Sequence, residues 1–119
     1  MRAIVVWTAL PSVPAARKLA GALVQNRLAS CVSVLPGAIS TYRWNKKIEK
    51  SREALVFIKT SKARWNAVQK FVLSRHPYEL PELIVLPVVA GSKKYLDWMV
   101  DLSGLEPLAS SLRTRRSTN

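Results

Sequence analysis

The fold is decided by one long stretch, CVSVLPGAISTYRWNKKIEKSREALVFI, which occupies residues 31–58. It is apolar at both ends, over residues 31–35 and 54–58, and becomes polar towards its middle. Pro36-Gly37 interrupts the first half, which predicts a bulge or bend in a strand. Asn45-Lys46 stands between the halves as a two-residue turn, although no glycine strengthens it. The stretch therefore predicts a long hairpin with a buried base and a tip that projects into water.

A strand and a helix are predicted before this hairpin. Residues 3–7 form a short continuous apolar run, which is typical of a strand covered on both faces. Ser12 can cap a helix, with Pro14 in the first turn, where proline is tolerated. Apolar side chains then recur with helical spacing as far as residues 26–28 and predict an amphipathic helix. Its apolar face consists of Ala16, Leu19, Ala20, Leu23 and Val24.

A helix, a strand and a further short helix are predicted after the hairpin. Ser61 can cap the second helix, which ends at Arg75 because a proline disfavours helical backbone at the residue before it. Residues 83–89 form a second continuous apolar run and predict a buried strand. Gly91-Ser92 then begins a short third helix. The apolar positions of the last two helices are Trp65, Val68, Val72, Leu96, Met99 and Val100.

The order strand, helix, strand, strand, helix, strand predicts an α+β fold. It is the pattern of a ferredoxin-like βαββαβ sandwich, in which two helices cover one face of a four-stranded antiparallel sheet, here with an additional C-terminal helix. We expect one domain over residues 1–105 and a basic tail over residues 106–119. So small a domain has too few elements to cover both sheet faces. Assembly through the open face is therefore expected.

Net charge and cysteine content indicate which partners and which cellular compartment suit the chain. Nineteen Lys and Arg against seven acids give a formal net charge of +12, which raises nucleic acid as an alternative partner. The charges are spread along the chain, and the one dense cluster is residues 113–116, so a solvated basic surface is the preferred interpretation. No apolar run has the length of a membrane span. The single cysteine, Cys31, allows no internal disulfide and favours a reducing, cytoplasmic location.

The polar segment of residues 76–82 has the densest collection of reactive side chains. It contains the only histidine, His76, with Tyr78, Glu79 and Glu82, between two prolines that stiffen the backbone. Two interpretations are open. The segment is either a site or a rigid helix-to-strand connection, and the residues alone slightly favour the connection.

Five ordered blocks stand out in this chain: residues 28–32, 36–44, 58–60, 76–82 with 86–88, and 95–98. Together they resemble the CutA family of divalent-cation-tolerance proteins. The resemblance implies a ferredoxin-like subunit, a homotrimer with a fold similar to the PII signalling proteins, and a role in tolerance to copper and other divalent metals. The family has no firmly established enzyme activity, so the chain is not expected to be an enzyme.

Metal binding is implied by the family but weakened by the residues present. The copper ligands proposed in the family correspond here to Trp7, Arg75 and His76. Indole does not replace a thiolate, and a permanently charged guanidinium repels a cation. The remaining candidate ligands for copper or another divalent cation are His76, Glu79 and Cys31. The place of Cys31 at the start of an apolar strand favours a role as a small buried side chain.

The resemblance also implies clefts between subunits, and we expect them to carry Tyr42, Trp44, Lys59, Tyr78, Glu79 and Trp98 beside His76. Two other functions fit the sequence less well. Recognition of RNA by a ferredoxin-like sheet uses an Arg/Lys-Gly-Phe-type motif, which the sequence lacks. A phosphate hydrolase of the acylphosphatase type needs a glycine-bearing anion loop after the first strand, and residues 8–11 contain no glycine.

Overall fold

The structure is a computed structural model that describes residues 2–101. The predicted basic tail, residues 106–119, and its arginine cluster lie outside the described residues. Within residues 2–101, every helix is too short or too polar to span a bilayer.

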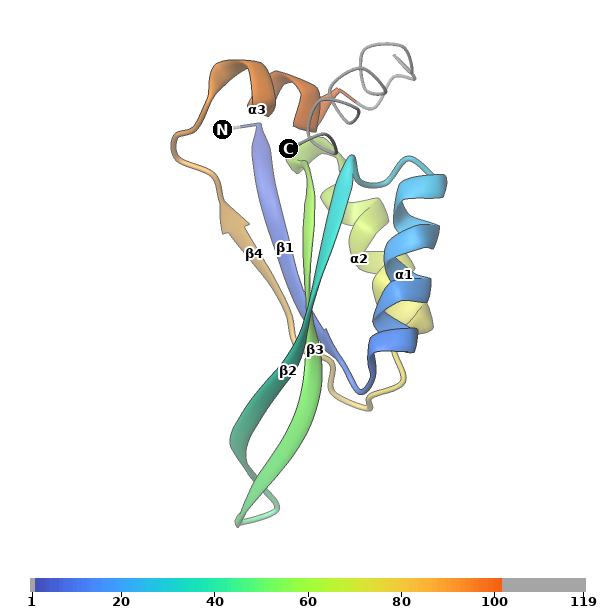
Figure 1. The fold of residues 1–119 in the computed structure, drawn as a ribbon, viewed down its shortest axis with the longest axis vertical. Helices are drawn as coiled ribbons and strands as arrows, with labels where there is room; N and C mark the ends of the chain where they lie inside the picture. The colour runs from blue at the N-terminus through green and yellow to red at the C-terminus, as the bar shows by residue number, and fades with distance from the viewer. Residues whose placement is uncertain (1, 102–119) are drawn as a thin grey trace.

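Four antiparallel strands form one sheet in the order β2-β3-β1-β4. The connection through α1 joins β1 to β2 with β3 between them, and the connection through α2 joins β3 to β4 with β1 between them. This arrangement confirms the predicted ferredoxin-like fold (Figure 1). The strands are β1 (Ala3–Leu10), β2 (Cys31–Trp44), β3 (Lys47–Ser61) and β4 (Leu83–Pro87).

Helix α1 (Val13–Gln25) begins where the sequence predicts. The Ser12 side chain accepts a hydrogen bond from the backbone N–H of Ala15 at 3.2 Å, which satisfies one of the unpaired donors of the first turn. Leu19 and Leu23 are buried on the predicted face, whereas Val24 is exposed at its edge.

Helix α2 (Trp65–Arg75) begins later than predicted. The expectation that Ser61 caps it is wrong, because Ser61 is the last residue of β3, pairs with Ala3 and is followed by a 3-10 turn. The end at Arg75 is confirmed, since His76 has extended backbone ahead of the proline.

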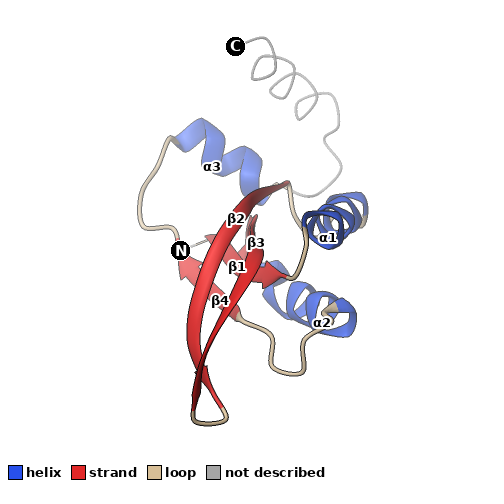
Figure 2. Ribbon diagram, turned by 60° about the horizontal axis from the view of Figure 1, so that its bottom comes forward, coloured by secondary structure: helices blue, strands red, loops and turns tan. Residues whose placement is uncertain are grey.

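The core lies between the two long helices and the sheet face they cover. Figure 2 shows α1 and α2 together on one side of the sheet. The most completely buried side chains come from every layer, including Val6 and Ile58 from the sheet and Leu23 and Val72 from the helices.

The opposite sheet surface, called here the open face, is covered at one end only. Helix α3 (Lys93–Val100) packs there through Trp98 and Met99 against Ala3. The remainder is apolar and accessible, with Leu35, Ile84 and Leu86 between 41% and 54% exposed. The predicted strand of residues 83–89 ends two residues early, and Val89 is 82% exposed.

The hairpin projects past the rest of the sheet (Figure 1). Asn45 and Lys46 both have positive φ, 49° and 66°, as a type I′ turn requires, so the predicted two-residue turn is confirmed. The predicted irregularity at Pro36-Gly37 is also confirmed, as a β-bulge between Leu35 and Ala38. Gly37 has φ of 80°, which glycine adopts without a steric penalty.

Candidate functional site

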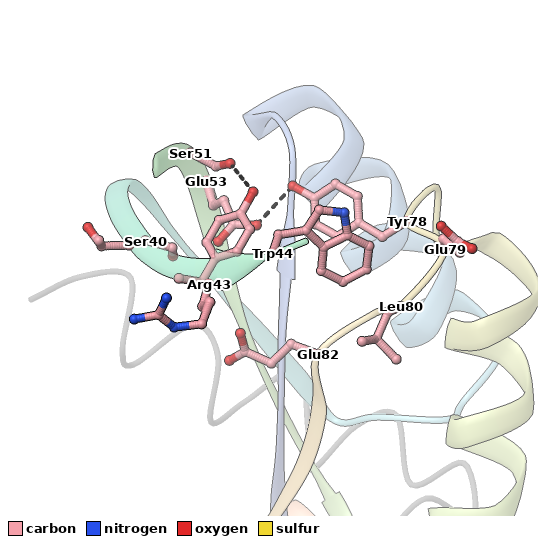
Figure 3. Close-up of a pocket in the computed structure, with 11 residues that line it drawn as sticks. Ser40, Arg43, Trp44, Ser51, Glu53, Tyr78, Glu79, Leu80 and Glu82 are labelled. Atoms are coloured by element: carbon pink, nitrogen blue, oxygen red, sulfur yellow. Dashed lines mark hydrogen bonds between the residues drawn. The ribbon is translucent and has the colours of Figure 1, made fainter. Parts of the chain in front are cut away.

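A cavity of about 700 Å³ lies where the hairpin faces the loop that follows α2. Its volume falls within the range of small-molecule sites. Figure 3 shows lining side chains from β2 and β3 on one side and from the loop on the other. The lining residues are Ser40, Thr41, Tyr42, Arg43, Trp44, Ser51, Glu53, Tyr78, Glu79, Leu80 and Glu82.

The bulge decides which hairpin side chains share a face with Glu53. Leu35 pairs with Leu55, and Ala38 pairs with Glu53, so two residues of β2 lie opposite one of β3. Directly paired residues share a face, and one extra residue reverses the alternation that follows it. The side chain of Tyr42 therefore lies on the same sheet face as Glu53. Without the bulge, Thr41 and Arg43 would lie on that face instead.

The pair formed by Glu53 and Tyr78 is the most constrained part of the cavity. The Tyr78 hydroxyl donates a hydrogen bond to Glu53 Oε2 at 2.8 Å, and Glu53 is only 8% exposed. Burial, followed by the hydrogen bond and the negative charge of Glu53, raises the pKa of Tyr78 to about 12. The phenol is therefore a neutral donor to a buried carboxylate at physiological pH.

His76 holds the backbone of Tyr78 in place through hydrogen bonds. Its Nδ1 accepts a hydrogen bond from the backbone N–H of Tyr78 at 3.2 Å, so its proton lies on Nε2, which donates to the carbonyl of Ala9 at 2.8 Å. Burial lowers the pKa of His76, although the bond to Ala9 and the charge of Glu53 act in the opposite direction. A neutral imidazole thus ties the loop to the end of β1.

The hairpin aromatics are more accessible than this pair. Tyr42 and Trp44 are 42% and 41% exposed, and the Tyr42 hydroxyl lies 2.8 Å from Ser51 Oγ. Four of the residues expected in a cleft therefore line one cavity: Tyr42, Trp44, Tyr78 and Glu79.

The other two residues expected in a cleft lie elsewhere. Lys59 donates from Nζ to Ser33 Oγ at 2.9 Å and approaches Cys31 Sγ at 3.7 Å. Trp98 belongs to α3, is 8% exposed and packs in the cluster with Ala3. Neither residue lines the cavity.

The candidate metal ligands do not converge. Both ring nitrogens of His76 have protein partners, and Cys31 is level with Val5 in the sheet register, about 13 Å along the strands from Ala9. Among residues 2–101, no three His, Cys, Asp or Glu side chains are grouped so as to hold a metal ion. The residues present therefore do not fit a copper centre.

The positions that correspond to proposed family ligands have other contacts here. Trp7 packs edge-on against Phe57 with ring centroids 4.8 Å apart, and its buried Nε1 has no hydrogen-bond partner within the described residues. The Arg75 guanidinium lies 3.7 Å from the ring centroid of Phe71, a cation–π contact.

Sequence reasoning missed Glu53, the buried acid of the cavity. It is the last polar residue before the apolar run of residues 54–58, and an acid at such a boundary is a usable signal. Its partner Tyr78 is 25 residues away in sequence, so the pair follows only from the folded arrangement.

Known proteins resemble this chain in both sequence and fold. Residues 4–102 match the family described as CutA1 divalent ion tolerance protein. The divalent-cation tolerance protein CutA of Thermus thermophilus is 39% identical over 100 residues, 84% of this chain and 97% of that protein. The crystal structure of CutA from Xylella fastidiosa has a TM-score of 0.79 and 42% identity, covering 82% of this chain and 93% of that one.

Some relatives are longer than the matched region. The chloroplastic protein CutA of Arabidopsis thaliana is 41% identical over 96 residues, which are 81% of this chain but 53% of that protein. The chain thus spans about half the length of this plant relative.

The fold defines a ferredoxin-like α+β protein with a cavity between hairpin and loop. The sequence match defines the family, and the chain belongs to the CutA1 divalent ion tolerance protein family.

Proposed function

We propose that this chain forms a cytoplasmic, non-enzymatic homotrimer that serves divalent-cation tolerance by binding a small ligand in clefts between subunits. The cavity beside Tyr42, Trp44 and Tyr78 is the proposed ligand site. The observation that carries the proposal is this cavity, built around a buried carboxylate and accessible aromatic rings. The family's tolerance role supplies the biological setting.

The open face supports assembly. Leu35, Ile84 and Leu86 leave a large apolar surface in water, flanked by the ring pair of Trp7 and Phe57. Contiguous apolar surface of this kind is typical of an interface between subunits. Burying it against other copies is favourable, at roughly 25 cal/mol per Å² of apolar area.

Light scattering after size exclusion tests the assembly. A mass near three times 13.3 kDa is expected for the full chain. Leu86→Glu places a charge on the open face and should dissociate the trimer. Val24→Glu, at an exposed position of α1, is the matched control and should leave the mass unchanged. A monomeric wild-type protein at micromolar concentration would rule out the trimer.

Growth under metal stress tests the biological role. Cells that lack this gene should become more sensitive to copper salts, and the wild-type gene should restore tolerance. A Trp44→Ala gene should restore less than a Val24→Ala gene at equal protein level. Equal restoration by both genes would remove the cavity from the proposal.

Calorimetry with Cu²⁺ tests whether the ligand is copper itself. Because both His76 nitrogens have protein partners, we expect weak binding that is unchanged in His76→Ala. Tight binding that disappears in the variant would establish His76 as a ligand.

A further inference from the structure

We propose that the cavity binds a small organic ammonium ion. This ligand class deepens the proposed function and rests on the cavity being the ligand site. The carrying observation is the combination of aromatic rings with a buried, negatively charged Glu53 in one space.

Negative charge is concentrated in the cavity of an otherwise basic chain. Glu53, Glu79 and Glu82 are three of the chain's seven acidic residues, and Arg43 is the one basic residue in the lining. In Figure 3 Glu53 approaches the space from the hairpin and Glu82 from the loop, whereas Glu79 lies on the far side of the Tyr78 ring from Glu53. A cavity with this excess of acids attracts cations and repels phosphates and carboxylates.

Glu53 lacks a cationic partner of its own. No Lys, Arg or His side chain within residues 2–101 forms an ion pair with it, and Tyr78 donates its one recorded hydrogen bond. A carboxylate accepts about four hydrogen bonds. Tyr78 supplies one of these bonds, so a bound cation with N–H groups can donate further charge-assisted bonds to the same carboxylate.

The aromatic rings favour an organic cation. Tyr42 and Trp44 come from β2, and Tyr78 comes from the loop, so ring surface borders the cavity from both sides. An ammonium group within about 6 Å of a ring centroid is attracted by the ring's quadrupole, and the effect strengthens out of water. The apolar part of an organic ion also gains contact with Leu80.

An inorganic cation fits the same groups less well. Calcium takes six to eight oxygen ligands and magnesium a near-octahedral set, whereas the acids here form no metal-holding group among the described residues. Aromatic faces do not replace those oxygens. The geometry thus selects a cation that needs one or two carboxylates and apolar surroundings.

Isothermal calorimetry on the full-chain oligomer tests the inference with a matched ligand pair. Benzylammonium carries the charge, and benzyl alcohol has nearly the same shape without it. We expect benzylammonium to bind at least about tenfold more tightly than benzyl alcohol, since a charge-assisted bond to a buried carboxylate is lost with the alcohol. Magnesium chloride at the same concentrations should give no saturable heat.

Three variants locate the binding. Glu53→Gln keeps the shape and an acceptor for Tyr78, and it should weaken benzylammonium by about tenfold or more. Glu82→Gln, at an exposed lining position, should weaken it by about threefold, and it keeps the test valid if the first variant fails to fold. Glu49→Gln is the control, because this acid lies on the same strand but does not line the cavity.

The outcomes separate the inference from the function beneath it. Equal binding of benzyl alcohol and benzylammonium, lost in Trp44→Ala, would overturn the ammonium inference and leave the ligand site standing. If neither compound binds and Trp44→Ala changes the oligomer mass, the cavity is a contact surface for a second copy of the chain. That result would overturn both the ammonium inference and the proposed ligand site. Saturable magnesium heat lost in Glu53→Gln would replace the organic ion with an inorganic one.

Discussion

The two ends of the sheet hold polar side chains under very different conditions. At the hairpin end, Glu53 is buried beside a cavity and receives a hydrogen bond from Tyr78. At the α3 end, Lys59 donates a hydrogen bond to Ser33 and lies near Cys31 Sγ, and Trp98 is enclosed by packing. The resemblance implies cleft residues at both ends, and the cavity lies beside those at the hairpin end.

The difference teaches how to separate a site from a supporting contact. A residue that serves the fold is held by contacts within the chain, as Lys59 is by its bond to Ser33 and Trp98 by its packing. A residue that serves a ligand keeps accessible surface or charge, as Trp44 and Glu53 do. Substitutions at the two ends should therefore change different quantities.

The largest effect is expected at the α3 end. Trp98→Ala removes a nearly buried indole that joins α3 to the sheet, and it should lower the free energy of unfolding by about 3 kcal/mol. Denaturant unfolding of the oligomer measures this loss. Benzylammonium affinity should stay unchanged, because Trp98 does not line the cavity. If Trp98→Ala were as stable as wild type but bound benzylammonium more weakly, Trp98 would serve the ligand and not the fold.

A smaller loss of stability is expected at the hairpin end. Tyr78→Phe leaves the buried Glu53 without its donor and should cost about 2 kcal/mol in the same unfolding measurement. Tyr42→Phe is the matched control, because its hydroxyl is exposed and bonds only Ser51 among the described residues. Its cost should stay within about 0.5 kcal/mol. Equal costs for both variants would show that burial of Glu53 does not matter.

The smallest effect is a pH dependence that comes from His76. Burial lowers its pKa in the folded state below the ordinary value of 6.5, so the unfolded chain binds more protons in this range. Its contribution is therefore present above pH 6.5 and is lost as the pH falls through the lowered folded pKa. Unfolding measured at pH 7.5 and pH 5.5 should show a steeper loss for wild type than for His76→Gln. Parallel losses would mean that other groups dominate.

Much of the fold could be predicted because its signals are local. Ser12 caps α1 through a neighbour three residues away, and Asn45-Lys46 forms its turn within two residues. The continuous apolar runs mark buried strands in a similar way. The prediction at Ser61 failed where a long-range contact prevailed, since pairing with Ala3 extended β3 past the expected cap.

The candidate site could be predicted only in part. The quoted family blocks contain Tyr42, Trp44, Tyr78 and Glu79, and the structure brings these four residues to one cavity. Glu53 was missed because its importance depends on burial and on a partner from the far side of α2. The resemblance also implies Lys59 and Trp98 as cleft residues, and only the folded chain shows that they lie at the α3 end, away from the cavity.

The sequence by itself determined the family, the order of elements and the positions of the bulge and the turn. These features depend on the backbone preferences of proline, glycine and asparagine and on hydrophobic spacing, which act over a few residues. Only the tertiary structure decided that the bulge turns Tyr42 towards Glu53 and that the loop brings Tyr78 to meet it. The physical reason is that strand register and burial are set by contacts between segments far apart in the chain.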